Sequence, residues 1–168
     1  EEKAYWLGFI CADGYVSYNK NTQSYQFKIT LQQSDKDYLR KFIKAISGNF
    51  DVKLKTAKVK FNGTYKEYKI CEVSFRDKIF TSNLLKYFQT NKTEYLRIPN
   101  GIPSKLMRHF IRGFSDGDGC FYCNSVKRDK SFEIVGKCYD MLLDIKNEFS
   151  KNSIKSEIYR KRKTNWKL

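Results

Sequence analysis

Hydrophobic and polar residues alternate strictly along residues 25–31, which read Tyr-Gln-Phe-Lys-Ile-Thr-Leu. A period of two residues predicts a β-strand that turns one face toward a core. Tyr, Phe, Ile and Leu form the apolar side of this strand, and Gln26, Lys28 and Thr30 form the other. The sequence therefore predicts a sheet with a dry face and a wet, basic face.

The residues after this strand have the apolar spacing of a helix. Residues 34–37 (Ser-Asp-Lys-Asp) are typical of a helix start, and apolar residues then recur at helical intervals until Ser47 and Gly48 end the helix. Asn62 and Gly63, between two strand-like stretches, predict a tight hairpin. The other elements expected in this half are a helix over 3–12, strands over 15–18, 52–61 and 65–75, and a helix over 78–88.

The only two prolines, Pro99 and Pro103, bracket a short Asn-Gly-Ile segment, and such a cluster separates structural units. We place a first half at 1–98, a linker at 99–103 and a second half at 104–168. The second half repeats the order of elements, with a helix over 104–117, strands over 121–126 and 131–135, a helix over 139–149 and a strand over 155–161. The pattern predicts an α+β fold of two repeats. The second repeat is expected to be reduced or truncated by one strand and a final helix.

The charge balance indicates a polyanionic partner. Lys and Arg number 33 against 18 Asp and Glu, which gives a formal net charge of +15. Such a surplus favours phosphate-rich ligands, because each neutralised phosphate releases counterions. Aromatic residues make up 16% of the chain, which excludes a disordered basic tail. Nucleases, ribosomal proteins and membrane-surface proteins share this charge pattern.

Cysteine usage and hydropathy limit the compartment and the partners that we expect for this protein. The five cysteines are an odd number without the density of a disulfide framework, so we expect a reducing, intracellular compartment. Cys120 and Cys123 have CxxC spacing but no second pair nearby, and we interpret them as ordinary strand residues rather than a zinc site. No apolar run approaches the ~20 residues that span a bilayer, so no membrane partner is expected.

Two nine-residue stretches, 6–14 and 111–119, share one pattern. In each, an apolar run carries a Gly and, four positions on, a second small residue, and then closes with Asp-Gly. Small residues four apart share one helix face, where another backbone can approach closely. Gly14 and Gly119 suit the left-handed position just past a helix end. The small pairs are Gly8 with Ala12 and Gly113 with Gly117.

Asp13 and Asp118 would then lie at helix C-termini, where the helix dipole disfavours a carboxylate. A feature that opposes local stability and occurs twice is best explained by a bound divalent cation. The alternative is that each aspartate only forms a turn before its Gly. Because the two copies are 105 positions apart and each is followed by a similar pattern of strands and helix, we favour the cation.

The two stretches resemble the LAGLIDADG motif of homing endonucleases. The second copy keeps both acidic positions, whereas in the first Trp6 and Leu7 replace the opening Leu-Ala and Cys11 replaces the first acid. The resemblance implies two pseudo-symmetric αββαββα repeats, with the motif helices paired at the interface. It also implies a saddle-shaped antiparallel sheet that binds DNA.

By the same resemblance, Asp13 and Asp118 would bind Mg²⁺ or another divalent cation, together with the peptide carbonyls of Ala12 and Gly117. Gln32, or Gln33 if the register differs by one, would be the polar residue after the second strand. In the second half, Val135 and Gly136 fall at that place, so an asymmetric site is expected. Lys92 matches the lysine that precedes the second motif helix, where it would stabilise charge on the scissile phosphate; the alternative is a solvated surface lysine.

The wet strand face would read bases in the major groove, where Arg and Lys prefer guanine and Gln prefers adenine. The DNA-binding candidates are Gln26, Lys28, Thr30, Lys69, Arg76, Lys127, Arg128, Glu133, Arg160 and Arg162. The run at 160–163 is interpreted as a phosphate grip or, equally, as a solvated charge run.

The resemblance thus implies a monomeric endonuclease that cuts both strands of a long duplex site with Mg²⁺ and leaves short 3′ overhangs. One alternative is a cleavage-inactive nucleic-acid binder of the same fold, such as an intron maturase or a transcription regulator. Another is the endonuclease domain of an intein, although neither end of the chain shows splicing residues. A basic ribosomal or RNA-packaging protein would need neither Asp-Gly copy.

Overall fold

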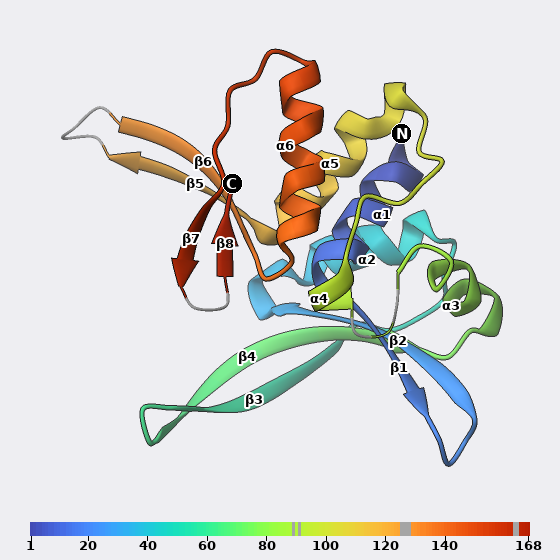
Figure 1. Cartoon of the computed structure of the whole chain (residues 1–168). Helices are drawn as coiled ribbons and strands as arrows, with labels where there is room; N and C mark the ends of the chain where they lie inside the picture. The colour runs from blue at the N-terminus through green and yellow to red at the C-terminus, as the bar shows by residue number, and fades with distance from the viewer. Residues whose placement is uncertain (89, 91, 125–128, 163–164) are drawn as a thin grey trace. The chain divides into compact units, whose positions relative to one another are not determined.

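The computed structural model of the chain describes residues 1–88, 90, 92–124, 129–162 and 165–168 (Figure 1). It divides into two compact units. One comprises Glu1–Ala12 together with Asn83–Leu168, and the other comprises Asp13–Ser82. The first helix, α1 (Glu2–Asp13), therefore lies almost entirely in the unit that contains the second half of the sequence.

The unit formed by Asp13–Ser82 holds a four-stranded antiparallel sheet. Its strands are β1 (Gly14–Asn19), β2 (Ser24–Gln32), β3 (Lys53–Phe61) and β4 (Thr64–Phe75), in the spatial order β1-β2-β4-β3. The short helix η1 (Gln33–Asp35) and helix α2 (Lys36–Ala45) follow β2. Helix α3 (Lys78–Leu84) carries the chain out of this unit.

The predicted alternation of β2 is confirmed at its centre. Phe27 and Ile29 are fully buried, and the Phe27 ring lies 5.8 Å from that of Phe42 on α2. Gln26, Lys28 and Thr30 occupy the other face and are only partly buried. Helix α2 thus covers the dry face and leaves the polar face open.

Two predicted chain reversals are also confirmed. Asn62 and Gly63 both have positive φ, 47° and 83°, as the two central residues of a type I′ hairpin require. After α2, Ser47 takes the left-handed conformation (φ 52°), and the Gly48 amide donates to the Ile43 carbonyl at 2.9 Å. This bond closes the helix end with a Schellman motif.

The other unit holds a second four-stranded antiparallel sheet and most of the helices. Helices α4 (Lys92–Tyr95), α5 (Ser104–Asp118) and α6 (Tyr139–Lys151) accompany α1. The strands β5 (Gly119–Asn124), β6 (Asp129–Gly136), β7 (Tyr159–Arg162) and β8 (Asn165–Lys167) have the spatial order β5-β6-β8-β7. No helix among the described residues is long and apolar enough to cross a membrane.

The two sheets repeat one topology. Gly14 pairs with Ile29 in the first sheet and Gly119 pairs with Ile134 in the second, so equivalent residues of the first two strands are 105 positions apart. Both sheets place the fourth strand beside the second. The predicted α+β fold with two repeats is confirmed.

The predicted strand at 155–161 is confirmed only at its end, because β7 begins at Tyr159. After it the chain forms a further strand, β8, for which the sequence pattern predicted no element and which pairs with both β6 and β7. Leu168 extends this pairing through two hydrogen bonds with Ile134, at 2.9 and 3.0 Å. A strand of three residues is too short to show alternation, which is why the sequence pattern missed it.

Helices α1 and α5 cross at the predicted glycines. A Cβ atom added to Gly8 would lie 2.0 Å from the Phe110 carbonyl oxygen, and one added to Gly113 would lie 1.9 Å from the Tyr5 carbonyl oxygen. The contacts are reciprocal, as expected for a pseudo-twofold axis between the two helices. The Tyr5 hydroxyl also donates to the Asp116 carboxylate at 2.5 Å.

The predicted left-handed conformation after the second motif helix is wrong. Gly119 has φ −92° and ψ 158°, which is extended backbone, and it begins β5. The reason for a glycine there is space, because a Cβ atom would lie 2.3 Å from the Ser115 carbonyl oxygen and 3.0 Å from the Phe132 ring. Gly14 likewise begins a strand, β1.

Candidate active site and nucleic-acid interface

The end of α1 is held by a buried lysine. Lys92, the first residue of α4, donates from Nζ to the Ala12 carbonyl oxygen at 2.8 Å and also to the Cys11 carbonyl oxygen. The last carbonyls of a helix have no partner within the helix and form the negative end of its dipole. An ammonium group satisfies both needs, so the buried position of Lys92 has a clear physical cause.

The same residues help to line a pocket of about 270 Å³. Ala12, Lys92 and Asp118 line it, so three segments far apart in the sequence meet there. The motif residues Ala12 and Asp118 come from the C-terminal ends of α1 and α5. The pocket brings together the Ala12 carbonyl of α1, the Asp118 carboxylate of α5 and the ammonium group of Lys92.

Cys11 takes the place of the first acid of the motif and is buried. Burial raises the pKa of its thiol to about 12, against a smaller lowering by the charge of Lys92. The thiol therefore stays protonated at neutral pH and supplies no negative charge to the pocket. In this respect the two motif copies differ chemically.

Asp13 and Gln32 belong to the other compact unit. Asp13 is the last residue of α1, and Gln32 is the exposed last residue of β2, with Gln33 following in η1. Gln32 pairs with Ile70 of β4. Each thus occupies the element end that the motif pattern predicted for it.

The spacing of the repeats corrects the expected counterpart of Gln32. Residues 105 positions apart are equivalent in the two sheets, which assigns Lys137 to this place rather than Val135 or Gly136. Lys137 lines the pocket that contains Asp118. Sequence reasoning missed it, although the distance between the two Asp-Gly copies already contained the signal.

The donors in the pocket fit a hard cation. The Asp118 carboxylate is an oxygen ligand of the kind that Mg²⁺ prefers, and so is the Ala12 carbonyl, which would share its oxygen with Lys92. Among the described residues, no group of three or more His, Cys, Asp and Glu side chains gathers at one point. A cation bound here would therefore need further oxygen ligands from water or from a phosphate group.

The predicted polar face of the first sheet carries an ordered set of side chains. Gln26 donates to the Ser74 hydroxyl at 3.1 Å, and the ammonium group of Lys28 lies 5.3 Å from the centre of the Tyr15 ring. Thr30 Oγ1 lies 3.5 Å from a carboxylate oxygen of Glu72, whose other oxygen accepts from Lys55 at 2.5 Å. Lys28 is thus a base-contact candidate whose charge faces an aromatic ring rather than a carboxylate.

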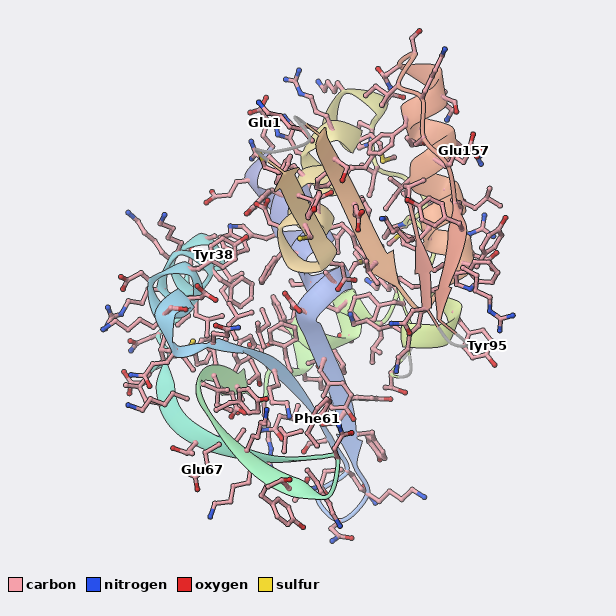
Figure 2. The ribbon with its side chains drawn as sticks, turned by 90° about the vertical axis from the view of Figure 1, so that its left-hand side faces the viewer. Glu1, Tyr38, Phe61, Glu67, Tyr95 and Glu157 are labelled. Atoms are coloured by element: carbon pink, nitrogen blue, oxygen red, sulfur yellow. The ribbon has the colours of Figure 1, made fainter. Side chains whose placement is uncertain are left out.

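Lys69 does not share that face. It lies on the same side of β4 as Cys71 and Val73, two and four positions further on, and that side is the dry face on which Val73 pairs with Ile29. The β3–β4 hairpin is exposed along most of its length, and Figure 2 shows side chains projecting from both of its faces around Phe61 and Glu67. Arg76 follows the end of β4 and is exposed.

The second sheet arranges its candidates differently. Glu133 pairs with the ammonium group of Lys167 across β6 and β8. That bond raises the pKa of Lys167, as does a bond to Tyr159. The Arg160 guanidinium lies 5.7 Å from the Trp166 ring, on the face opposite Glu133. Lys127, Arg128 and the side chain of Arg162 lie outside the part of the chain that the structure describes.

Comparison with protein families gives a match over just over half of the chain. The profile of the LAGLIDADG-like domain family matches residues 1–92. No curated protein sequence matches the chain.

Solved structures show the same fold over nearly the whole chain. Mesophilic variants of the homing endonuclease I-DmoI share 15% identity at a TM-score of 0.60, over 99% of this chain and 81% of theirs. The homing endonuclease I-WcaI bound to its DNA recognition sequence shares 14% identity at a TM-score of 0.61, over 99% and 74%. An I-DmoI variant in complex with target DNA and Mg shares 15% identity at a TM-score of 0.59, over 99% and 86%.

Proposed function

Because this chain belongs to the LAGLIDADG family, we propose that it is a site-specific endonuclease that hydrolyses both strands of duplex DNA with a divalent cation. The observation that carries the proposal is the pocket in which Ala12, Lys92 and Asp118 meet. It supplies a carboxylate, a main-chain oxygen and a positive charge, which are the groups that phosphodiester hydrolysis requires.

Each motif residue has a role in this proposal. Asp13 and Asp118 are the acidic cation ligands, and the carbonyls of Ala12 and Gly117 are further oxygen donors. A bound Mg²⁺ supplies the chemistry of activating water and stabilising the leaving oxygen. Mg is present with target DNA in the related I-DmoI structure, which supports this choice of ion.

The basic and polar side chains have separate tasks in this proposal. Lys92 holds the carbonyls that end α1, and its charge favours the approach of a phosphate group. Gln32 and its counterpart Lys137 orient the attacking water or the phosphate from the two repeats. The Lys side chain adds a positive charge that Gln lacks, so we expect the two cleavage reactions to differ in rate.

The recognition surface in this proposal is the polar face of the first sheet, with Gln26, Lys28 and Thr30 at its centre. The exposed Arg160 of the second sheet lies on the face opposite Glu133 and contributes through phosphate attraction. Lys69 lies on the other face and contributes through phosphate attraction rather than base contacts. Since α1 and α5 of one chain already pair, a monomer contains both motif helices and no partner subunit is required.

The test is selection of cleaved sites from a randomised duplex library in Mg²⁺ or in EDTA. Wild type, Asp13→Asn and Asp118→Asn are compared, with the exposed Asp37→Asn on α2 as the matched control. Cleavage in Mg²⁺ by wild type and Asp37→Asn, lost in the other two while binding remains, supports the endonuclease. Tight binding without cleavage in any divalent cation identifies a maturase or regulator instead and refutes the proposal.

A further inference from the structure

An apolar stripe lies exposed on the β3–β4 hairpin. It consists of Ala57, Val59 and Phe61 on β3, together with Tyr68 of β4, which pairs with Ala57. Val59 is 48% exposed, Phe61 58% and Tyr68 49%. Apolar side chains scattered singly over a surface are ordinary, whereas a contiguous row of them is typical of an interaction site.

The stripe lies on the polar face of the first sheet. Residues paired across antiparallel strands share a face, and the face alternates along each strand. Tyr68 is therefore on the same side of β4 as Glu72, four positions further on, and Glu72 pairs with Thr30 of β2. The stripe thus continues, toward the tip of the hairpin, the surface on which Thr30 and Lys28 lie.

The other face of β3 has a different composition at the same level of the hairpin. Thr56, Lys58 and Lys60 lie on that side. Strand propensity favours Val and Phe on either face, so it does not explain why the apolar residues share one. Packing does not explain it either, because Thr64–Lys69 pair with β3 alone among the described strands and both strands are largely exposed there. A ligand on that face gives the stripe a physical reason.

The hairpin has the charge and the width that suit the major groove of duplex DNA. Residues 53–70 include six lysines and one acidic residue, Glu67, a balance that attracts DNA phosphates. A two-stranded β-ribbon is narrow enough to enter this groove. Figure 1 shows β3 and β4 extending as such a ribbon beyond β2.

We propose that the apolar stripe contacts the methyl groups of thymine in the major groove, so that the DNA target carries A·T pairs where the hairpin binds. The thymine methyl is the apolar group that base edges present there. Residues two apart on a strand are ~6.6 Å apart, and successive bases rise by ~3.4 Å, so Ala57, Val59 and Phe61 would face positions about two base pairs apart. The inference rests on the DNA-binding part of the proposed function, to which it adds a base preference.

The charges around the stripe favour DNA over a protein partner. Lys66 pairs with Val59, and its ammonium group lies 5.4 Å from the centre of the Phe61 ring. The centre of a protein–protein interface is depleted of charged residues, so a lysine in the middle of the stripe is unfavourable there. In a groove between two phosphate backbones the same charge is favourable.

The experiment compares each selected DNA site with copies that lack one methyl group. Duplexes that bind the chain are selected from a randomised library, and each thymine is then replaced in turn by deoxyuridine. This replacement keeps the base pair and its hydrogen-bonding groups and removes only the methyl group. Because burial of one such group is worth about fourfold in affinity, we expect the Kd to rise by that factor at each thymine under the stripe.

Two serine variants assign the effect to one face of the hairpin. Val59→Ser removes an apolar group from the stripe. Leu54→Ser is the matched control, since Leu54 is also on β3 and is 55% exposed but pairs with Cys71 on the opposite face. Wild type and Leu54→Ser should show the same rise in Kd on loss of a methyl group, and in Val59→Ser the rise should disappear at one thymine at least. Thermal unfolding checks that both variants remain folded.

The outcomes separate this inference from the proposed function. Tight binding with no deoxyuridine effect in wild type overturns the inference and leaves the proposed function intact. The same holds if Val59→Ser keeps the whole effect, or if Leu54→Ser loses it too. Binding of no duplex overturns both. Methyl-dependent binding without cleavage in Mg²⁺ supports the inference and refutes only the endonuclease.

Discussion

Substituting alanine for the crossing glycines should separate α1 from α5. In Gly8→Ala the new methyl group would lie 2.0 Å from the Phe110 carbonyl oxygen, and in Gly113→Ala it would lie 1.9 Å from that of Tyr5. Real Cβ atoms essentially never approach other heavy atoms within 3.0 Å. Both obstacles are backbone atoms of a helix, so the helices must move apart by about 1 Å because no side chain can rotate away.

The expected loss follows from two opposing terms. Overpacking a rigid contact costs about 3 kcal/mol, at the upper end of the usual range. Alanine is intrinsically a better helix residue than glycine by about 1 kcal/mol. Each variant should therefore lose about 2 kcal/mol of unfolding free energy, which for a chain of this size lowers Tm by about 4–8 °C.

Denaturant unfolding followed by Trp6 fluorescence measures this loss, because Trp6 is buried on α1. Gly136→Ala is the matched control, since its Cβ would meet only the Leu142 side chain at an ordinary 3.9 Å. The reciprocal contacts predict similar losses for Gly8→Ala and Gly113→Ala. If either variant is as stable as Gly136→Ala, the close crossing of the helices is refuted.

Four further predictions concern single side chains. Lys92→Met should lower the free energy of unfolding by about 2 kcal/mol, measured by thermal unfolding, because two buried carbonyls lose a donor. Lys92→Ala also lacks the ammonium group, so if it were nearly as stable as wild type, the charge would be irrelevant. Between pH 9 and 12 the folded chain keeps the Cys11 proton that the unfolded chain releases, so stability should fall by up to ~1.4 kcal/mol per pH unit. An equally steep fall in Cys11→Ala would contradict this cause. Lys137→Met should slow cleavage about tenfold or more with little change in binding, and an unchanged rate would exclude Lys137 from the site. Lys28→Ala should reduce by about 1 the slope of the logarithm of the DNA association constant plotted against the logarithm of the salt concentration. An unchanged slope would place Lys28 outside the interface.

The sequence predicted those parts of the fold that local rules determine. The small residues at Gly8 and Gly113, the hairpin at Asn62 and the buried centre of β2 all depend on spacing within one element. The face of Lys69 was not predictable in this way, because neither face of the projecting β3–β4 hairpin is buried there. With no core on one side, polar and apolar residues do not alternate along this part of β4, and the pattern carries no orientation.

The contacts of Lys92 could not be predicted for a different reason. A lysine before the second motif helix is consistent with either a phosphate contact or a solvated position, and only the folded chain shows that it binds the end of α1. The carbonyls that it satisfies are 80 and 81 positions earlier in the sequence. No local pattern specifies a partner at that distance.

This bond also has a consequence for how the two halves of the sequence depend on each other. The compact unit of the second sheet includes Glu1–Ala12, and Gly8 fixes the crossing of α1 with α5. Lys92, near the end of the first half of the sequence, then binds the last turn of α1. The unit that contains Asp118 is thus incomplete without the first motif helix. A fragment that begins after α1 should therefore expose the face of α5 around Gly113 and lose the pocket, even though it retains its whole sheet.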